Sequence, residues 1–192
     1  MIIHKKMDHN SLKLTDEEKL IKIREFKEKG NAAHKEGNFK KAAGNYYRAV
    51  LYIKGLSKNC PDVPDLPGAF FAGTIPEPTR KMTPEMIWES ERLTCDCYNN
   101  LAACMLKESE PKYGRIIEHC DRALEVSPSN GKALFRKGIS LYSLGKLSEA
   151  LAVLKSAPAS PEVRRYIELC KAGLKQQDKE LTELYKGMFK LS

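Results

Sequence analysis

Residues 27–31 read KEKGN, and they lie in a pattern of apolar residues that is typical of an amphipathic helix. The glycine of this stretch starts a spacing that recurs later in the chain. The interval from Gly30 to Ala49 is the same as the interval from Gly138 to Ala157. Small residues allow two helices to pack closely, so we interpret each pair as one position in the first helix and one in the second helix of a hairpin.

A third pair of small residues lies between these two. The interval from Ala102 to Ala123 is longer by two positions, which indicates a hairpin with a longer turn. The interval from Ala49 to Ala123 is more than twice the interval from Ala123 to Ala157. These spacings predict a repeat with an insertion after the first hairpin. One hairpin cannot bury its apolar face alone, so the hairpins are expected to stack.

The periodicity predicts an all-α protein of seven helices: three hairpins and a long C-terminal helix that caps the last one. Thr15 is the expected N-cap of the first helix, because acidic residues follow it. Six prolines between residues 55 and 84 exclude a helix there and predict an irregular insertion at about 56–83. Residues 1–15 are polar without a sustained period, and we expect a flexible arm. The helices are expected at about 15–35, 42–53, 84–107, 111–126, 130–144, 147–156 and 161–190.

The composition limits the function classes. The net charge of +8 is compatible with nucleic acid, an anionic membrane surface or an acidic protein segment as partner. Because aromatic and basic residues are not interleaved, the sequence favours an acidic peptide over nucleic acid. No apolar run is long enough to span a membrane, and the first ten residues lack the apolar core of a secretory signal. We therefore expect an intracellular, cytoplasmic protein.

The spacing of the cysteines does not indicate a disulfide framework, a metal site or a catalytic thiol. Most of them lie at apolar positions of helical patterns, which favours buried free thiols over disulfides or a zinc site. The sequence contains no nucleophile-base motif, no P-loop and no dinucleotide fingerprint, so we predict no enzyme activity, no metal and no cofactor. The six cysteines are Cys60, Cys95, Cys97, Cys104, Cys120 and Cys170.

The interval from Ala123 to Ala157 equals the period of the tetratricopeptide repeat (TPR), about 34 residues, and the repeat resembles this motif. Phe26 replaces the usual Trp, and Lys54 replaces the usual Pro. The insertion, together with CYNNLAAC, VRRYIELCK and the GMF ending, resembles the small tetratricopeptide repeat protein 9 family. The ending ELYKGMFK is similar to that of large FK506-binding immunophilins.

The resemblance implies a right-handed superhelix over residues 16–190. Its expected parts are repeat 1 (about 23–55), the insertion, repeat 2 (about 84–128), repeat 3 (about 130–157) and a capping helix (about 161–190).

KEKGN, NNLAA and KALFR also resemble the carboxylate-clamp signature of TPR domains that bind chaperone tails ending in Glu-Glu-Val-Asp. The resemblance places a peptide-binding site on Lys27, Asn31, Asn100, Lys132 and Arg136. The chemistry suits a carboxylate, since lysine and arginine neutralise it and asparagine donates hydrogen bonds without charge. Each cation pair or cation–amide pair is four residues apart, on one helix face. We expect the side chains of Lys132 and Arg136 to point into solvent in the free protein.

Two functions follow from this interpretation. The first is a co-chaperone-like adaptor that binds the C-terminal tail of a heat-shock protein of the 90 or 70 class. The alternative is a scaffold for another partner, whose clamp groove is vestigial or self-occupied. The basic, amphipathic C-terminal helix also fits a calmodulin target, but a capping role is the favoured prediction. Tyr46 and Tyr98 are expected in the core, His34 is expected to be incidental, and Trp88 is expected either in the core or against the insertion.

Overall fold

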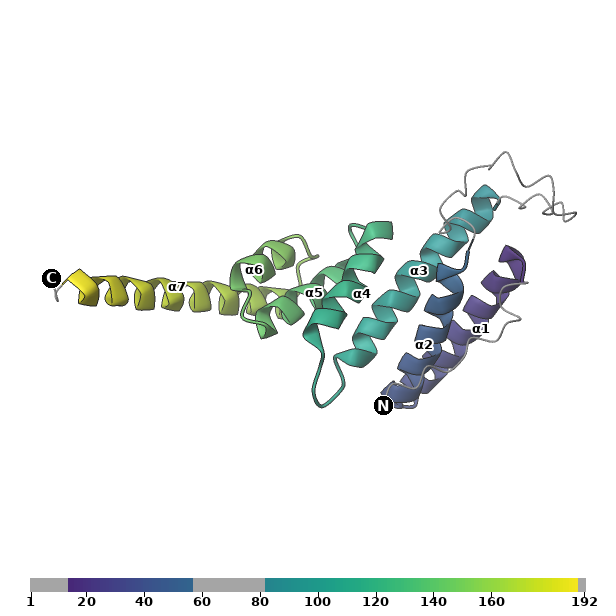
Figure 1. Cartoon of the computed structure of the whole chain (residues 1–192), viewed down its shortest axis with the longest axis horizontal. Coiled ribbons are helices and arrows are strands. Elements are labelled where there is room, and N and C mark those ends of the chain that lie inside the picture. The colour runs from purple at the N-terminus through teal and green to yellow at the C-terminus, as the bar shows by residue number, and fades with distance from the viewer. Residues whose placement is uncertain (1–13, 57–81, 190–192) are drawn as a thin grey trace, which may run out of the picture. The chain divides into compact units, whose positions relative to one another are not determined.

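The computed structural model describes residues 14–56 and 82–189 of the 192-residue chain. These residues form seven α-helices and no strand, which confirms the predicted all-α class (Figure 1). They group into two compact units, Met1–Cys97 and Tyr98–Ser192, whose boundary falls within the third helix. The helices are α1 (Asp16–Lys35), α2 (Phe39–Lys54), α3 (Pro84–Met105), α4 (Tyr113–Val126), α5 (Gly131–Ser143), α6 (Leu147–Lys155) and α7 (Pro161–Phe189).

Two expectations concern parts of the chain outside the described residues. The flexible arm is predicted at 1–15, of which 1–13 are not described, and the proline-rich insertion at 56–83, of which 57–81 are not described. Cys60 lies within the insertion. Both expectations remain predictions.

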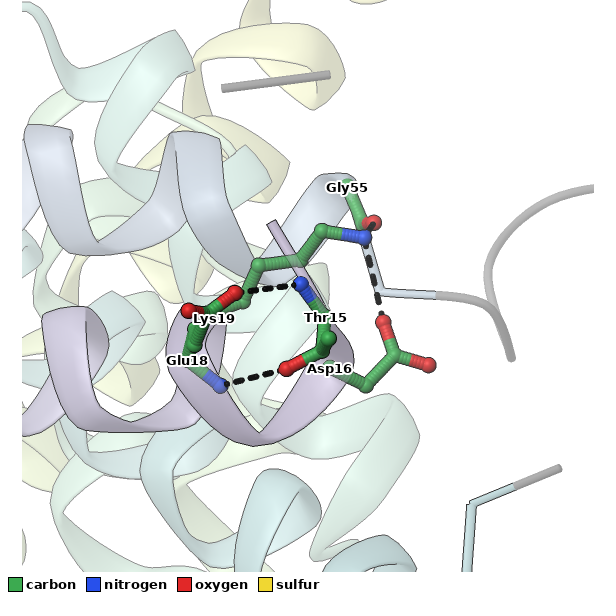
Figure 2. A network of polar contacts seen from close by, with 5 residues as sticks. All are labelled: Thr15, Asp16, Glu18, Lys19 and Gly55. Atoms are coloured by element: carbon green, nitrogen blue, oxygen red, sulfur yellow. Dashed lines mark hydrogen bonds and ion pairs between the residues drawn. The ribbon is translucent and has the colours of Figure 1, made fainter. Parts of the chain in front are cut away.

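The first helix begins with a reciprocal cap at Thr15, the predicted N-cap. The Thr15 hydroxyl accepts a hydrogen bond from the Glu18 N–H (3.2 Å), and the Glu18 carboxylate accepts one from the Thr15 N–H (2.8 Å). Figure 2 shows this capping box beside the Lys19 ammonium, which lies 3.1 Å from Asp16 and donates to the carbonyl of Gly55 (2.6 Å). Gly55 is the C-cap of α2, so Lys19 joins the start of α1 to the end of α2.

The capping box makes a stability prediction. Thr15→Ala should lower the free energy of unfolding by about 1 kcal/mol, because the N–H of Glu18 loses its acceptor. Thr15→Ser keeps the hydroxyl and should stay close to the wild type. Urea unfolding followed by circular dichroism measures both. An equal loss in the serine variant would mean that the methyl group of Thr15, and not the cap, stabilises the helix start.

The hairpins α1–α2 and α5–α6 pack around glycines at the same repeat position. A Cβ atom on Gly30 would lie 2.6 Å from Cε1 of Tyr46, and a Cβ atom on Gly138 would lie 2.5 Å from Cγ of Leu154. The interval between the glycine and its packing partner is the same in both hairpins. Tyr46 and Leu154 are fully buried. The structure thus confirms the predicted register of Gly30 and Gly138.

The turns of these two hairpins also use equivalent glycines. Gly37 has φ 75° and Gly145 has φ 74°, a conformation that side chains with a Cβ rarely adopt. Each follows the packing glycine of its hairpin at the same interval. The matching turns extend the repeat register beyond the helices themselves.

The prediction for Ala157 is wrong. Ala49 and Ala123 are fully buried in α2 and α4, but α6 ends at Lys155 and Ala157 lies two residues beyond it. The physical reason is Pro158, since a residue that precedes proline is disfavoured in the α conformation. The third hairpin therefore has a shorter second helix than the repeat spacing implied.

The five cysteines that the structure describes are buried and form no disulfide among the described residues, as predicted. Burial raises the pKa of Cys97 and of Cys120 to about 12, and that of Cys104 to about 11. Such thiols are protonated at neutral pH and unreactive. Nowhere in residues 14–56 or 82–189 do three His, Cys, Asp or Glu side chains form a group that could hold a metal ion.

Candidate functional site: the predicted carboxylate clamp

In the first unit, the predicted clamp lysine already has an anionic partner. The Lys27 ammonium on α1 lies 2.6 Å from a carboxylate oxygen of Asp96 on α3. The two side chains differ in exposure: 17% of the Lys27 side chain is exposed, compared with 43% of Asp96. The lysine is therefore half-buried and neutralised, while its partner borders on solvent.

A second ion pair joins the same two helices. The Arg24 guanidinium donates two hydrogen bonds to the Glu89 carboxylate, through Nε and NH2, each 2.6 Å long. The guanidinium hydrogen bond holds the pKa of Glu89 below its ordinary value. This two-pronged geometry is the stronger form of an arginine–carboxylate contact. It links α1 and α3 independently of Lys27.

Asn31 lies one turn after Lys27 and contacts the core of the first hairpin. Its amide oxygen accepts a hydrogen bond of 2.8 Å from the hydroxyl of Tyr46. Because Tyr46 is buried and packs against Gly30, it orients the Asn31 amide with the oxygen toward the hairpin. The burial of Tyr46 confirms its predicted place in the core.

In the second unit, a buried asparagine holds Arg136. The side-chain oxygen of Asn99 accepts a hydrogen bond from the Arg136 guanidinium, and its amide donates to Asn130 (3.0 Å). Asn130 is the N-cap of α5 and also accepts from the Ala133 N–H (3.0 Å). Asn99 thus connects the start of α5 to a side chain further along the same helix.

The prediction that Arg136 points into solvent is wrong. The residue is half-buried, and desolvation lowers the pKa of its guanidinium from the ordinary value. No carboxylate among the described residues forms an ion pair with it, so its partner is the neutral amide of Asn99. Lys132, one turn earlier, is exposed as predicted, and Asn100 is half-exposed.

The five predicted clamp residues divide between the two units. Lys27 and Asn31 share one face of α1 in the first unit. The second unit contains Asn100, in the last part of α3, and the two predicted clamp cations of α5, Lys132 and Arg136. In the first unit Asp96 pairs with Lys27, and in the second unit Asn99 accepts a hydrogen bond from Arg136. The clamp as a five-residue site stays a prediction.

Comparison with known proteins shows which family the chain belongs to. No family model matches the chain. Tetratricopeptide repeat protein 9C of Xenopus tropicalis is 33% identical over 175 residues, which cover 88% of this chain and 93% of that protein. The chain belongs to the tetratricopeptide repeat protein 9 family.

Solved structures agree with a TPR fold for this member of the tetratricopeptide repeat protein 9 family. The C-terminal TPR-containing domain of an FK506-binding protein from Plasmodium falciparum matches with a TM-score of 0.69 and 25% identity, covering 88% of this chain and 99% of that domain. The first TPR domain of Spaghetti (RPAP3), bound to the HSP90 peptide SRMEEVD, matches with a TM-score of 0.53 and 17% identity, covering 84% and 99%. The second likeness concerns the fold alone.

The C-terminal helix of this family member has two parts with different surroundings. Near its start, Cys170 joins a buried cluster with Leu154 of α6 and Leu141 of α5, in agreement with the predicted capping role. From Lys175 to Lys186 every residue is exposed. No helix in the described ranges is both long and apolar enough to cross a membrane. The exposed apolar side chains toward the end of α7 are Leu181, Leu184, Tyr185 and Met188.

Sequence reasoning missed three side chains that hold the predicted clamp residues: Asp96, Asn99 and the hydroxyl of Tyr46. Asp96 lies far from Lys27 along the chain, and no local spacing links them. Asn99 could have been noticed, since it precedes the predicted Asn100, but only the folded chain shows which of the two contacts Arg136.

The structure decides the predictions that placed Tyr98 and Trp88 in the core. Tyr98 is buried as expected, and its ring lies 5.8 Å from that of His119. The core alternative for Trp88 is wrong, because 65% of the residue is exposed and its ring faces the Arg92 guanidinium at 5.5 Å. Its alternative partner, the insertion, lies outside the described residues. His34 contacts Phe39 edge-on at 5.2 Å.

Proposed function

We propose that this protein is an interaction adaptor that binds an acidic C-terminal peptide of the Glu-Glu-Val-Asp type, as found on heat-shock chaperones of the 90 or 70 class. The proposed contacts are Lys27, Asn31, Asn100, Lys132 and Arg136. Support for the partner class comes from the TPR domain of Spaghetti (RPAP3), which was solved with the HSP90 peptide SRMEEVD. Such an adaptor needs no catalytic group.

The observation that carries the proposal is the environment of Arg136. A half-buried charge is ordinarily paired with an opposite charge, because desolvation without such a pair is costly. Arg136 instead donates to the neutral amide of Asn99 and keeps its positive charge uncompensated by any carboxylate of the described chain. The exposed ammonium of Lys132 is one turn away on α5. Two cations on one helix face, neither paired with a carboxylate of the described residues, suit a carboxylate ligand.

The peptide end supplies the matching charges. A C-terminal aspartate carries two carboxylates, one on the main chain and one on the side chain. Charge-assisted hydrogen bonds to such groups contribute about 1.5–3 kcal/mol each. Asparagine amides add donors to such a site without adding charge.

Calorimetry with a short peptide ending in Glu-Glu-Val-Asp tests the proposal. Lys132→Ala should weaken binding about tenfold and leave the melting temperature unchanged, because the side chain is exposed in the free protein. Amidation of the peptide C-terminus should weaken binding at least as much, and added salt should weaken it further. Absence of binding at high micromolar peptide, or equal binding by wild type and variant, would refute the clamp.

A scaffold that holds a different partner is the second candidate. The observation that favours it is the apolar stripe on the exposed part of α7, which a free helix in water does not need. Under this alternative, Leu184→Asp would abolish retention of the partner, while the acidic peptide would not bind at all.

A further inference from the structure

Lys27, the first predicted clamp cation, already forms an ion pair with Asp96 in the free protein. The Lys27 ammonium and the Asp96 carboxylate lie 2.6 Å apart, within the range of a charge-assisted hydrogen bond. Lys27 and Arg136 therefore differ in kind. Asp96 neutralises the former, whereas the neutral amide of Asn99 holds the latter.

The Lys27–Asp96 pair is not needed to join α1 to α3. The two-pronged contact of Arg24 with Glu89 already links these helices. Glu89 is also the less exposed of the two acids, with 21% of its side chain exposed. Asp96 borders on solvent, and its one ion pair among the described residues is with Lys27. Its carboxylate can therefore turn toward water when another anion takes its place.

We propose that Asp96 is an internal competitor that occupies Lys27 until a ligand carboxylate displaces it. The inference rests on the proposed function, and it adds a residue that sets the affinity of the site. Binding then exchanges one ion pair for another and leaves Asp96 close to an incoming negative charge. Like charges placed together oppose association. The native affinity for an acidic tail is accordingly lower than the cations alone would provide.

The proposal also specifies ligand selectivity. A ligand with one weakly held carboxylate does not displace Asp96, whereas a C-terminal aspartate offers two adjacent carboxylates that can compete for Lys27. Asp96 thus disfavours isolated acidic side chains relative to a free acidic C-terminus.

Asp96→Asn tests the inference, with a matched control in the second unit. Asp121 pairs with Lys137 at the same distance, 2.6 Å, and its side chain has the same exposure, 43%. Asp121→Asn therefore makes the same change in net charge and removes an equivalent ion pair, but at a lysine outside the proposed clamp. Asp96→Glu retains the negative charge and should bind like the wild type.

The expected result is a gain in affinity specific to residue 96. Asp96→Asn should bind the Glu-Glu-Val-Asp peptide about two- to tenfold more tightly than wild type, as expected for removal of a partly exposed ion pair. Its affinity should fall more steeply with added salt, because the peptide then meets an unneutralised Lys27. Asp121→Asn should stay within about twofold of the wild type.

Three outcomes overturn the inference: an unchanged affinity, a weaker affinity, or an equal gain in Asp121→Asn. A weaker affinity would mean that Asp96 orients Lys27 for the ligand. Thermal unfolding of each variant by circular dichroism verifies that the compared proteins are folded. If neither wild type nor Asp96→Asn binds the peptide, the proposed function itself fails, which separates the two conclusions.

Discussion

Arg136→Ala is expected to weaken binding of an acidic C-terminal peptide by about 10- to 100-fold. The guanidinium provides a planar donor fork that is already oriented by Asn99, so the peptide does not have to order it. Calorimetry against the Glu-Glu-Val-Asp peptide measures the loss. Arg136→Lys keeps the charge without the fork and should recover only part of the affinity.

Arg136→Ala should also have a lower free energy of unfolding than the wild type, whereas Lys132→Ala should not. Asn99 is 6% exposed, and loss of the guanidinium leaves its oxygen without that donor. A buried acceptor without a donor costs about 1–3 kcal/mol, and the removal of a desolvated charge offsets part of this cost. We expect a net loss of about 1 kcal/mol, or a melting temperature lower by roughly 2–4 °C. Unchanged binding with lower stability would make Arg136 a structural residue only.

Gly30→Ala is expected to destabilise the first hairpin, whereas Gly44→Ala is expected to stabilise it. Both glycines are helical, so alanine brings the same gain in helix propensity, about 0.5–1 kcal/mol. Only at Gly30 does the new Cβ meet another group, at 2.6–2.9 Å from three atoms of the Tyr46 ring. Around Gly44, none of the described residues beyond the glycine's own neighbours and the nearby helix backbone has an atom within 4 Å of that position.

Because the gain in helix propensity is the same in both variants, the difference between their free energies of unfolding measures the clash with Tyr46. Tyr46 is 1% exposed, so its ring lies in the core, where overpacking should cost about 2–3 kcal/mol. The melting temperature of Gly30→Ala should then lie roughly 5–10 °C below that of Gly44→Ala. Peptide binding should weaken as well, because Tyr46 holds Asn31. Equal melting temperatures would show that the two helices separate without cost, in contradiction to the repeat packing.

Local patterns were sufficient for the helices and most of the repeat register. Apolar spacing and turn glycines are properties of neighbouring residues, so they predict elements such as α1, with its cap at Thr15. The recurring interval between small residues correctly paired Gly30 with the second helix of its hairpin. The same interval wrongly placed Ala157 in a helix. Because Pro158 disfavours the α conformation of the residue before it, α6 ends at Lys155.

Contacts between distant parts of the chain required the tertiary structure. The sequence by itself determined the all-α repeat and the identities of the clamp candidates, since these follow from local periodicity and from recurrence along the chain. Only the fold decided that Asp96 neutralises Lys27 and that Asn99 holds a half-buried Arg136. The reason is physical: the partner of a charged side chain depends on which helices pack together, and residues 37 or 69 positions apart share no local pattern that reveals their contact.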